Sequence, residues 1–111
     1  MGRIYIIAEA EINHNGDIET AKKMIEVAKE CGADCVKFQY IIASEIADQS
    51  SPYYGLFKKA ELSQGQFIEL KEFAGKSVGI DFMMTVTSCK TFYLTRELGI
   101  KKIKISSSNL T

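Results

Sequence analysis

The sequence lacks several features that mark particular classes of protein. Its 111 residues contain a single histidine, His14, so this chain cannot build a metal site from several histidines. No apolar stretch approaches the roughly 20 residues needed to cross a bilayer, and no membrane span is predicted. Basic and acidic residues balance at 14 each without a basic run, which argues against a nucleic-acid-binding surface.

The cysteines are few, and they do not have the spacing of metal ligands. Cys31 is predicted to end a helix and Cys35 to lie in a strand, and we expect these two cysteines and Cys89 to be buried free thiols. The amino terminus is interrupted by Glu9 and Glu11 too soon to form a secretory signal. These features predict a reduced, cytoplasmic protein.

Short apolar runs that lead into polar residues are the main feature of the chain. Helical patterns separate these runs, so the sequence predicts strands that alternate with helices, and such alternation implies parallel strands joined by right-handed crossovers. Their polar ends should then meet at the carboxyl edge, where α/β folds place their chemistry. The four runs are Ile4–Ala8 ending at Glu9, Cys35–Val36 leading into Lys37–Gln39, Phe82–Met84 ending at Thr85, and Lys102–Ile103 leading into Lys104–Ser107.

Capping residues and apolar spacing predict three helices. The first begins after Asp17 and ends at Gly32, the second has a capping box of Ser63 and Gln66, and the third begins near Thr87 or Ser88 and ends at Gly99. Residues 40–62 are predicted to form a long loop over the carboxyl edge, with a short helix around Tyr54–Lys59. The expected inward side chains are Ala21, Met24, Ile25 and Ala28, then Phe67, Leu70, Phe73 and Ala74, then some combination of Phe92, Leu94 and Leu98.

Four strands and three helices do not close a sheet, and a (β/α)8 barrel needs about 250 residues. We therefore interpret residues 1–111 as an α/β chain that forms the amino-terminal portion of a TIM barrel, with the remainder of the barrel absent. The outer edge of the fourth strand is expected to be unpaired and apolar.

Alternation along the strands directs Lys37 and Lys104 to the barrel interior, near its upper rim. A buried ammonium group must be paired, because burying an isolated charge is very costly. Two such lysines, with the hydroxyls of Thr85, Ser106 or Ser107 beside them, would form a cradle for a ligand carrying phosphate or carboxylate. Alternatively, each lysine extends to solvent or pairs with Glu9.

The stretch 12–17 follows the first strand and is rich in asparagine and glycine, which favours a tight turn. His14 in this stretch is either a turn residue or a ligand contact.

Several of these segments together resemble the sialic acid synthase family, which includes N-acetylneuraminate, legionaminate, pseudaminate and spore-coat relatives. The resemblance covers essentially the whole chain, and the combination of Asn13–Gly16 with Val36–Gln39 is its specific part. The segments are Ile6–Asp17, Gly32–Gln39, Glu61–Ser63, Glu97–Gly99 and Lys104–Ser107.

The resemblance implies a carbon–carbon bond-forming transferase that condenses phosphoenolpyruvate with an N-acylated amino sugar, typically N-acetylmannosamine. The products would be a nine-carbon 2-keto acid and phosphate. It also implies a TIM barrel followed by an antifreeze-like domain, absent here, in a homodimer. A divalent metal, Mn or Mg, is expected to activate the aldehyde, with histidine ligands from the second half of the barrel and therefore not in this chain.

The resemblance also assigns roles to individual residues. Lys37 matches the lysine that holds phosphoenolpyruvate, and Glu9 matches a catalytic carboxylate at the sugar, whose site Gln39 also lines. The positions that complete the anion pocket are Thr85, Lys104 and Ser107.

Three segments depart from the family pattern. Glu11 stands where the family commonly has glycine, and Met84–Thr87 replaces Ser-Thr-Pro-Phe, which affects the sugar site. Ser106–Asn109 stands where Ala-Ser-Gly-Asp or Gly-Ser-Gly-Glu is common.

Three hypotheses follow, of which we favour the first. The chain is the amino-terminal part of a sialic acid synthase-like enzyme, and the isolated 111 residues are inactive. Otherwise it is a non-catalytic half-barrel that binds anions or a partner chain, or it belongs to another phosphoenolpyruvate–aldose synthase.

Overall fold

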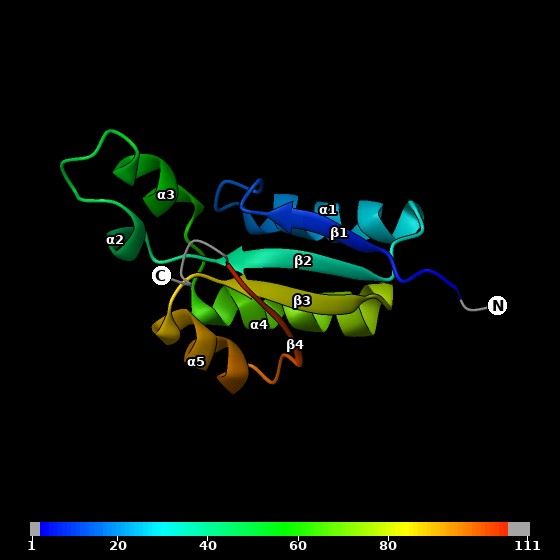
Figure 1. The fold of residues 1–111 in the computed structure, drawn as a ribbon. Helices are drawn as coiled ribbons and strands as arrows, with labels where there is room; N and C mark the ends of the chain where they lie inside the picture. The colour runs from blue at the N-terminus through cyan, green and yellow to red at the C-terminus, as the bar shows by residue number, and fades with distance from the viewer. Residues whose placement is uncertain (1–2, 107–111) are drawn as a thin grey trace.

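A four-stranded parallel sheet forms the centre of the computed structural model, which describes residues 3–106. The strands lie in sequence order, β1-β2-β3-β4, as consecutive right-handed crossovers produce (Figure 1). This arrangement confirms the predicted parallel α/β fold and its four strands. The strands are β1 (Ile7–Glu11), β2 (Cys35–Tyr40), β3 (Asp81–Val86) and β4 (Lys102–Ile105).

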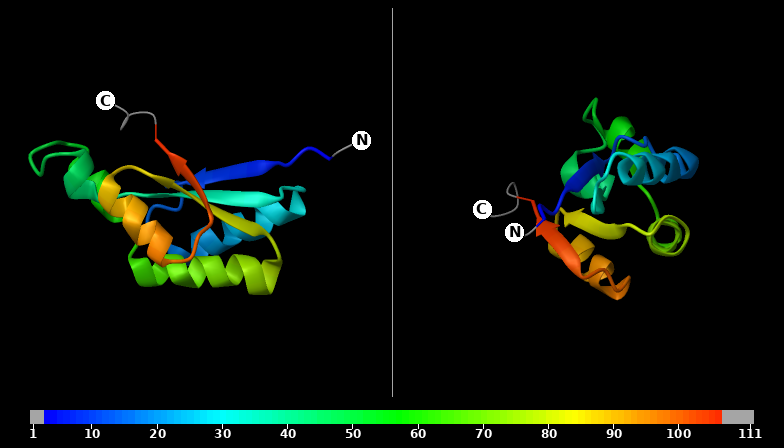
Figure 2. Two further views of the ribbon diagram at one scale, coloured as in Figure 1. Left: turned by 60° about the horizontal axis from the view of Figure 1, so that its bottom comes forward. Right: turned by 90° about the vertical axis from the view of Figure 1, so that its right-hand side faces the viewer.

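Three helices cover one face of this sheet: α1 (Ile18–Glu30), α4 (Gln64–Glu72) and α5 (Cys89–Glu97), as Figure 2 shows. A π-helical segment, η1 (Phe73–Val78), continues α4. We call the opposite side of the sheet its open face. Two short helices, α2 (Ala43–Ile46) and α3 (Tyr54–Ala60), lie beyond the carboxyl ends of the strands (Figure 1).

The predicted capping residues form hydrogen bonds at the starts of the three covering helices. The Asp17 side chain accepts from the backbone N–H of Glu19 at the start of α1. Ser63 and Gln66 form the capping box of α4, and Ser88 caps α5 through Thr91. These bonds satisfy backbone groups that the first turn of a helix leaves without partners, so each helix begins at a defined residue.

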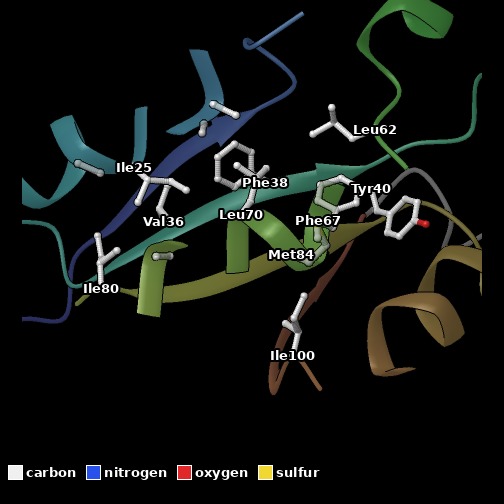
Figure 3. Packing of buried hydrophobic residues seen from close by; sticks show 14 of the residues in the cluster. Ile25, Val36, Phe38, Tyr40, Leu62, Phe67, Leu70, Ile80, Met84 and Ile100 are labelled. Atoms are coloured by element: carbon white, nitrogen blue, oxygen red, sulfur yellow. The ribbon is translucent and has the colours of Figure 1, made fainter. Parts of the chain in front are cut away.

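The hydrophobic core lies between the sheet and the covering helices (Figure 3). Val36 and Phe38 point from β2 into this layer and are at most 1% exposed. They contact the apolar stripe of the helices, of which Ile25, Phe67 and Leu70 are fully buried. Because side chains alternate along β2, the burial of Val36 and Phe38 turns Lys37 to the open face.

The structure corrects the predicted bounds of the first strand. Ile4 to Ile6 precede β1, which begins at Ile7 and extends through Glu11. Ile7 pairs with Cys35, the first residue of β2, so Ile4 and Tyr5 lie before the start of that pairing. Ile4 is therefore 79% exposed.

Two further predictions hold, and the structure adds to each of them. The buried residues of α5 are Thr91 and Thr95, with Leu98 just beyond the helix, whereas Phe92 and Leu94 are only partly buried. Residues 40–62 contain α2 in addition to the short helix predicted near Tyr54.

The predicted burial of the cysteines holds for Cys35 and fails for Cys31 and Cys89. Cys31 is exposed because it caps the carboxyl end of α1, outside the packed layer. In the part of the chain that the structure describes, no helix is long and apolar enough to span a membrane.

Candidate anion-binding site on the open face

The predicted site residues of the four strands lie beside one another on the open face. Glu9 is opposite Lys37 in the pairing of β1 with β2, and Thr85 of β3 is opposite both Gln39 and Lys104. They line one hollow of about 420 Å³, which we call the lysine hollow. Its lining residues are Glu9, Glu11, Lys37, Gln39, Thr85, Lys104, Ile105 and Ser106. Ser107, the remaining predicted residue, lies outside the described residues.

Lys37 is the buried cation of the site, with 3% exposure. Its Nζ donates to Glu9 Oε1 at 3.0 Å and lies 3.3 Å from Glu11 Oε1. Burial, the largest single effect, lowers the pKa of Lys37, but the two carboxylates together outweigh it and leave that pKa above its ordinary value. Lys37 is therefore protonated at neutral pH, and the pairing with Glu9 that the sequence left open is present.

Glu9 has a largely exposed side chain, at 60%. The hydrogen bond from Lys37, followed by the charge of Lys37 and that of Lys104, holds the pKa of Glu9 below its ordinary value. Glu9 is therefore an ionised hydrogen-bond acceptor at the mouth of the hollow, accessible to a ligand.

Glu11 has an unusual backbone for its residue type. Its φ is 51°, in the left-handed region that favours glycine, and the register of β1 with β2 shifts between Glu9 and Glu11. This conformation brings the Glu11 carboxylate to Lys37. Oε1 is buried and makes no hydrogen bond within residues 3–106, because its approach to Nζ is close in distance but lacks hydrogen-bond geometry.

Thr85 contributes a buried hydroxyl. Its side chain is 6% exposed, and Oγ1 has no hydrogen-bond partner among the described residues. A buried hydroxyl without a partner is destabilising. An acceptor oxygen entering the lysine hollow would remove this cost.

His14 is a turn residue in the structure. It is 1% exposed, and its Nδ1 accepts from the backbone N–H of Gly16. Burial lowers the pKa of His14, so the ring is neutral with its proton on Nε2. This geometry supports the turn interpretation over the ligand contact.

A second cavity, of about 720 Å³, adjoins the lysine hollow and shares Gln39 with it. We call it the upper cavity, since it lies beyond the carboxyl ends of β2 and β3. Its apolar wall consists of Ile12, Ile41, Ile46 and Phe57. Its polar lining consists of Gln39, Glu45, Thr87, Ser88 and Cys89.

Across residues 3–106, no three histidine, cysteine, aspartate or glutamate side chains come together as metal ligands.

Comparison with known proteins identifies the family to which the chain belongs. The family model described as the NeuB family matches residues 24–111. A crystal structure of N-acetylneuraminic acid synthetase from Leptospira borgpetersenii, in complex with citrate, superposes with a TM-score of 0.89 at 31% identity, covering 97% of this chain and 38% of that one. The chain belongs to the NeuB family.

Two curated relatives match nearly the whole chain. An uncharacterized protein of Methanocaldococcus jannaschii is 43% identical over 107 residues, which is 96% of this chain and 32% of the relative. The N,N'-diacetyllegionaminic acid synthase of Legionella pneumophila is 39% identical, covering 96% of this chain and 34% of the relative. The chain thus spans about a third of the length of these relatives.

Sequence reasoning missed two parts of the site. Glu11 was identified as a departure from the family pattern, but its left-handed backbone was not predicted, although the family preference for glycine at this position was a signal for it. The upper cavity was not predicted, because its lining comes from segments far apart in the chain, including the short helices α2 and α3, where apolar periodicity is weak.

Proposed function

We propose that the chain supplies the phosphoenolpyruvate-binding half of a NeuB-type synthase. The reaction would condense phosphoenolpyruvate with an N-acylated amino sugar of the N-acetylmannosamine type, giving a nine-carbon 2-keto acid and phosphate. The observation that carries this proposal is the lysine hollow, where Lys37 and Lys104 face the same space beside the hydroxyl of Thr85, which has no hydrogen-bond partner within residues 3–106.

The lysines would hold the anion. Lys37 is buried and protonated, so its interaction with a phosphate or carboxylate oxygen would be screened less than that of a surface lysine. Lys104 supplies a second positive charge from β4, and Thr85 would donate a hydrogen bond. Together these groups would fix phosphoenolpyruvate and stabilise the negative charge on the departing phosphate.

Glu9 and Gln39 would act on the acceptor sugar. Glu9 is ionised and largely exposed, so it could accept hydrogen bonds from sugar hydroxyls and move protons during condensation. Gln39 lies between the lysine hollow and the upper cavity, where its amide could orient the acceptor next to the enol carbon.

The proposal includes features that the family resemblance implies outside this chain. These are a divalent metal whose ligands lie elsewhere in the full-length protein, a homodimer, and a cytoplasmic location. The roles proposed above for the residues of this chain do not involve the metal.

Binding of phosphoenolpyruvate, measured by calorimetry with the 111-residue chain, tests the proposal. Lys37→Met should weaken binding by about tenfold or more, because a buried charge-assisted contact contributes roughly 1.5–3 kcal/mol. Lys76→Ala is the matched control, since this lysine is exposed on η1. Equal affinity of the Lys37→Met variant and the unmodified protein, with circular dichroism unchanged, would refute the pocket assignment.

A second candidate function is a non-catalytic half-barrel that binds anions. The charge of the lysine hollow favours the absence of catalysis, because Glu9 and Glu11 already balance Lys37 and Lys104 and leave less attraction for a multiply charged substrate. We propose that the isolated chain has no synthase activity. Formation of a sialic acid by the purified chain, given manganese and both substrates, would show the opposite.

A further inference from the structure

A cluster of polar side chains lies on the open face, nearer the amino ends of the strands than the lysine hollow. Tyr5 Oη donates to Asp81 Oδ2 at 2.6 Å. Lys102 Nζ donates to Tyr5 Oη at 2.6 Å and to Asp81 Oδ2 at 2.8 Å. The ammonium group of Lys102 also lies 4.5 Å from the centre of the Tyr5 ring. We call these three residues the tyrosine cluster.

The tyrosine cluster connects parts of the sheet that do not pair with each other. Tyr5 precedes β1, Asp81 begins β3 and Lys102 begins β4. β1 and β4 are the two outer strands of the described sheet, with β2 and β3 between them. The hydrogen bond from Lys102 to Tyr5 therefore joins the two edges of the sheet across its open face.

Each member of the tyrosine cluster has its ordinary charge at neutral pH. Desolvation and the hydrogen bond to Asp81 raise the pKa of Tyr5 to about 12, so the phenol is protonated. The hydrogen bond to Asp81 raises the pKa of Lys102, and the hydrogen bond from Lys102 lowers the pKa of Asp81. A general acid or base needs a pKa near the working pH, so the cluster is suited to holding strands together and not to proton transfer.

The register of the sheet places the tyrosine cluster next to the lysine hollow. Lys102 and Lys104 lie two residues apart on the same face of β4, opposite Met83 and Thr85 respectively. β4 has only four residues and, among the described strands, pairs with β3 alone. A short strand with one neighbour opens more readily than a central strand. A contact at its first residue therefore restricts the movement of the whole strand.

From this geometry we propose that Tyr5 is a positioning residue of the anion site and acts through Lys102 and Lys104. The tyrosine cluster holds β4 in place, so that Lys104 faces the lysine hollow beside Lys37. Without the cluster, Lys104 occupies a wider range of positions, and its average attraction to a bound anion decreases. The inference rests on the proposed function, which identifies the anion as phosphoenolpyruvate, and it adds a residue that does not line the hollow.

Tyr5→Phe tests this role, because it removes the hydroxyl and keeps both the ring and the net charge. We expect calorimetry to show that phosphoenolpyruvate binds about threefold more weakly, which corresponds to the loss of one modest hydrogen bond. In a Lys104→Met background the same change should have no effect, since the residue through which Tyr5 acts is absent. An equal loss in both backgrounds, or no loss in either, would overturn the inference.

Ser63→Ala is the control that separates positioning from general destabilisation. It removes the cap of α4, on the covered side of the sheet, so it should lower stability without changing the affinity for phosphoenolpyruvate. If Ser63→Ala weakens binding as much as Tyr5→Phe does, the effect of Tyr5 is one of stability and the inference is wrong.

Hydrogen exchange of the chain without ligand provides a measurement that does not depend on the proposed function. Tyr5→Phe should increase the exchange rates of residues 102–105 about threefold and leave those of residues 35–40 unchanged. If phosphoenolpyruvate does not bind the unmodified protein, the proposed function fails, while faster exchange in β4 still supports the restraint on this strand. Unchanged exchange in β4 refutes the inference even if phosphoenolpyruvate binds.

Discussion

Glu11 Oε1 lies 3.3 Å from the Nζ of Lys37, and the backbone of Glu11 has a φ of 51°. A residue other than glycine in this region is strained by roughly 1–2 kcal/mol. The strained backbone places a second carboxylate on a lysine that Glu9 already neutralises. Glu11 therefore competes with any anion that approaches Lys37.

Replacing Glu11 should strengthen anion binding. Glu11→Gly removes both the charge and the strained side chain, and we expect phosphoenolpyruvate to bind about tenfold more tightly, since one charge interaction near a protein surface is of the order of 1.4 kcal/mol or more. Glu11→Gln removes the charge alone and should give most of the same gain. Unchanged or weaker binding in both variants, measured by calorimetry, would contradict the competition.

Gly16 should not tolerate alanine. A Cβ at this position would lie 1.9 Å from the carbonyl oxygen of Lys59, and φ is +81°. Both the clash with the backbone of α3 and the left-handed conformation then oppose the substitution, and we expect a loss of more than about 3 kcal/mol in the free energy of unfolding.

Gly32→Ala is the control for this prediction. Its φ is +91°, but nothing lies within 4 Å of the added Cβ, so only the conformational cost of about 1–2 kcal/mol remains. Urea unfolding of the two variants measures the difference. If the two variants lose the same free energy of unfolding, the steric clash between the turn at Gly16 and α3 is refuted.

The burial of His14 should make stability depend on pH. Its folded-state pKa is below the ordinary value of 6.5, so the unfolded chain binds the proton more readily. The stabilisation is complete above about pH 6.5 and decreases as the pH falls toward the folded-state pKa. Thermal unfolding between pH 7 and pH 5 should show this decrease.

His14→Gln should remove this dependence in the same range. Carboxylates with lowered pKa values, such as Asp17 and Asp34, lose their contribution only at lower pH, below about 4. A slope between pH 7 and pH 5 that is the same in the variant would assign it to other groups.

Ser88 both caps α5 and fixes Glu45. Ser88→Ala should cost about 1 kcal/mol, a typical value for a lost N-cap, and should also loosen α2. Ser63→Ala, which removes the cap of α4 alone, should cost a similar amount without affecting α2. Hydrogen exchange of residues 43–46 distinguishes the variants, and faster exchange in both or in neither would refute the specific coupling.

The parts of this fold that could be predicted from the sequence are those that depend on residues close together in the chain. Asp17, Ser63 and Ser88 lie where the caps were predicted, because a cap depends on a side chain and a backbone within three residues of it. The alternation of side chains along β2 is also a local property, and it correctly predicted that Lys37 lies on the opposite face of the sheet from Val36 and Phe38. The start of β1 was predicted wrongly, because a strand exists only where a neighbour pairs with it, and that pairing is not local.

For the site, the sequence by itself determined which chemical groups the strands carry and on which face each one lies, since both follow from residue type and a period of two. Only the tertiary structure decided how those groups meet. Three features of the site depend on register and packing between segments far apart in the chain. They are the bulge that turns Glu11 toward Lys37, the upper cavity, and the buried hydroxyl of Thr85, which has no partner in the described part of the chain. These long-range contacts have no periodic signal in the sequence, because each depends on the positions of several elements at once.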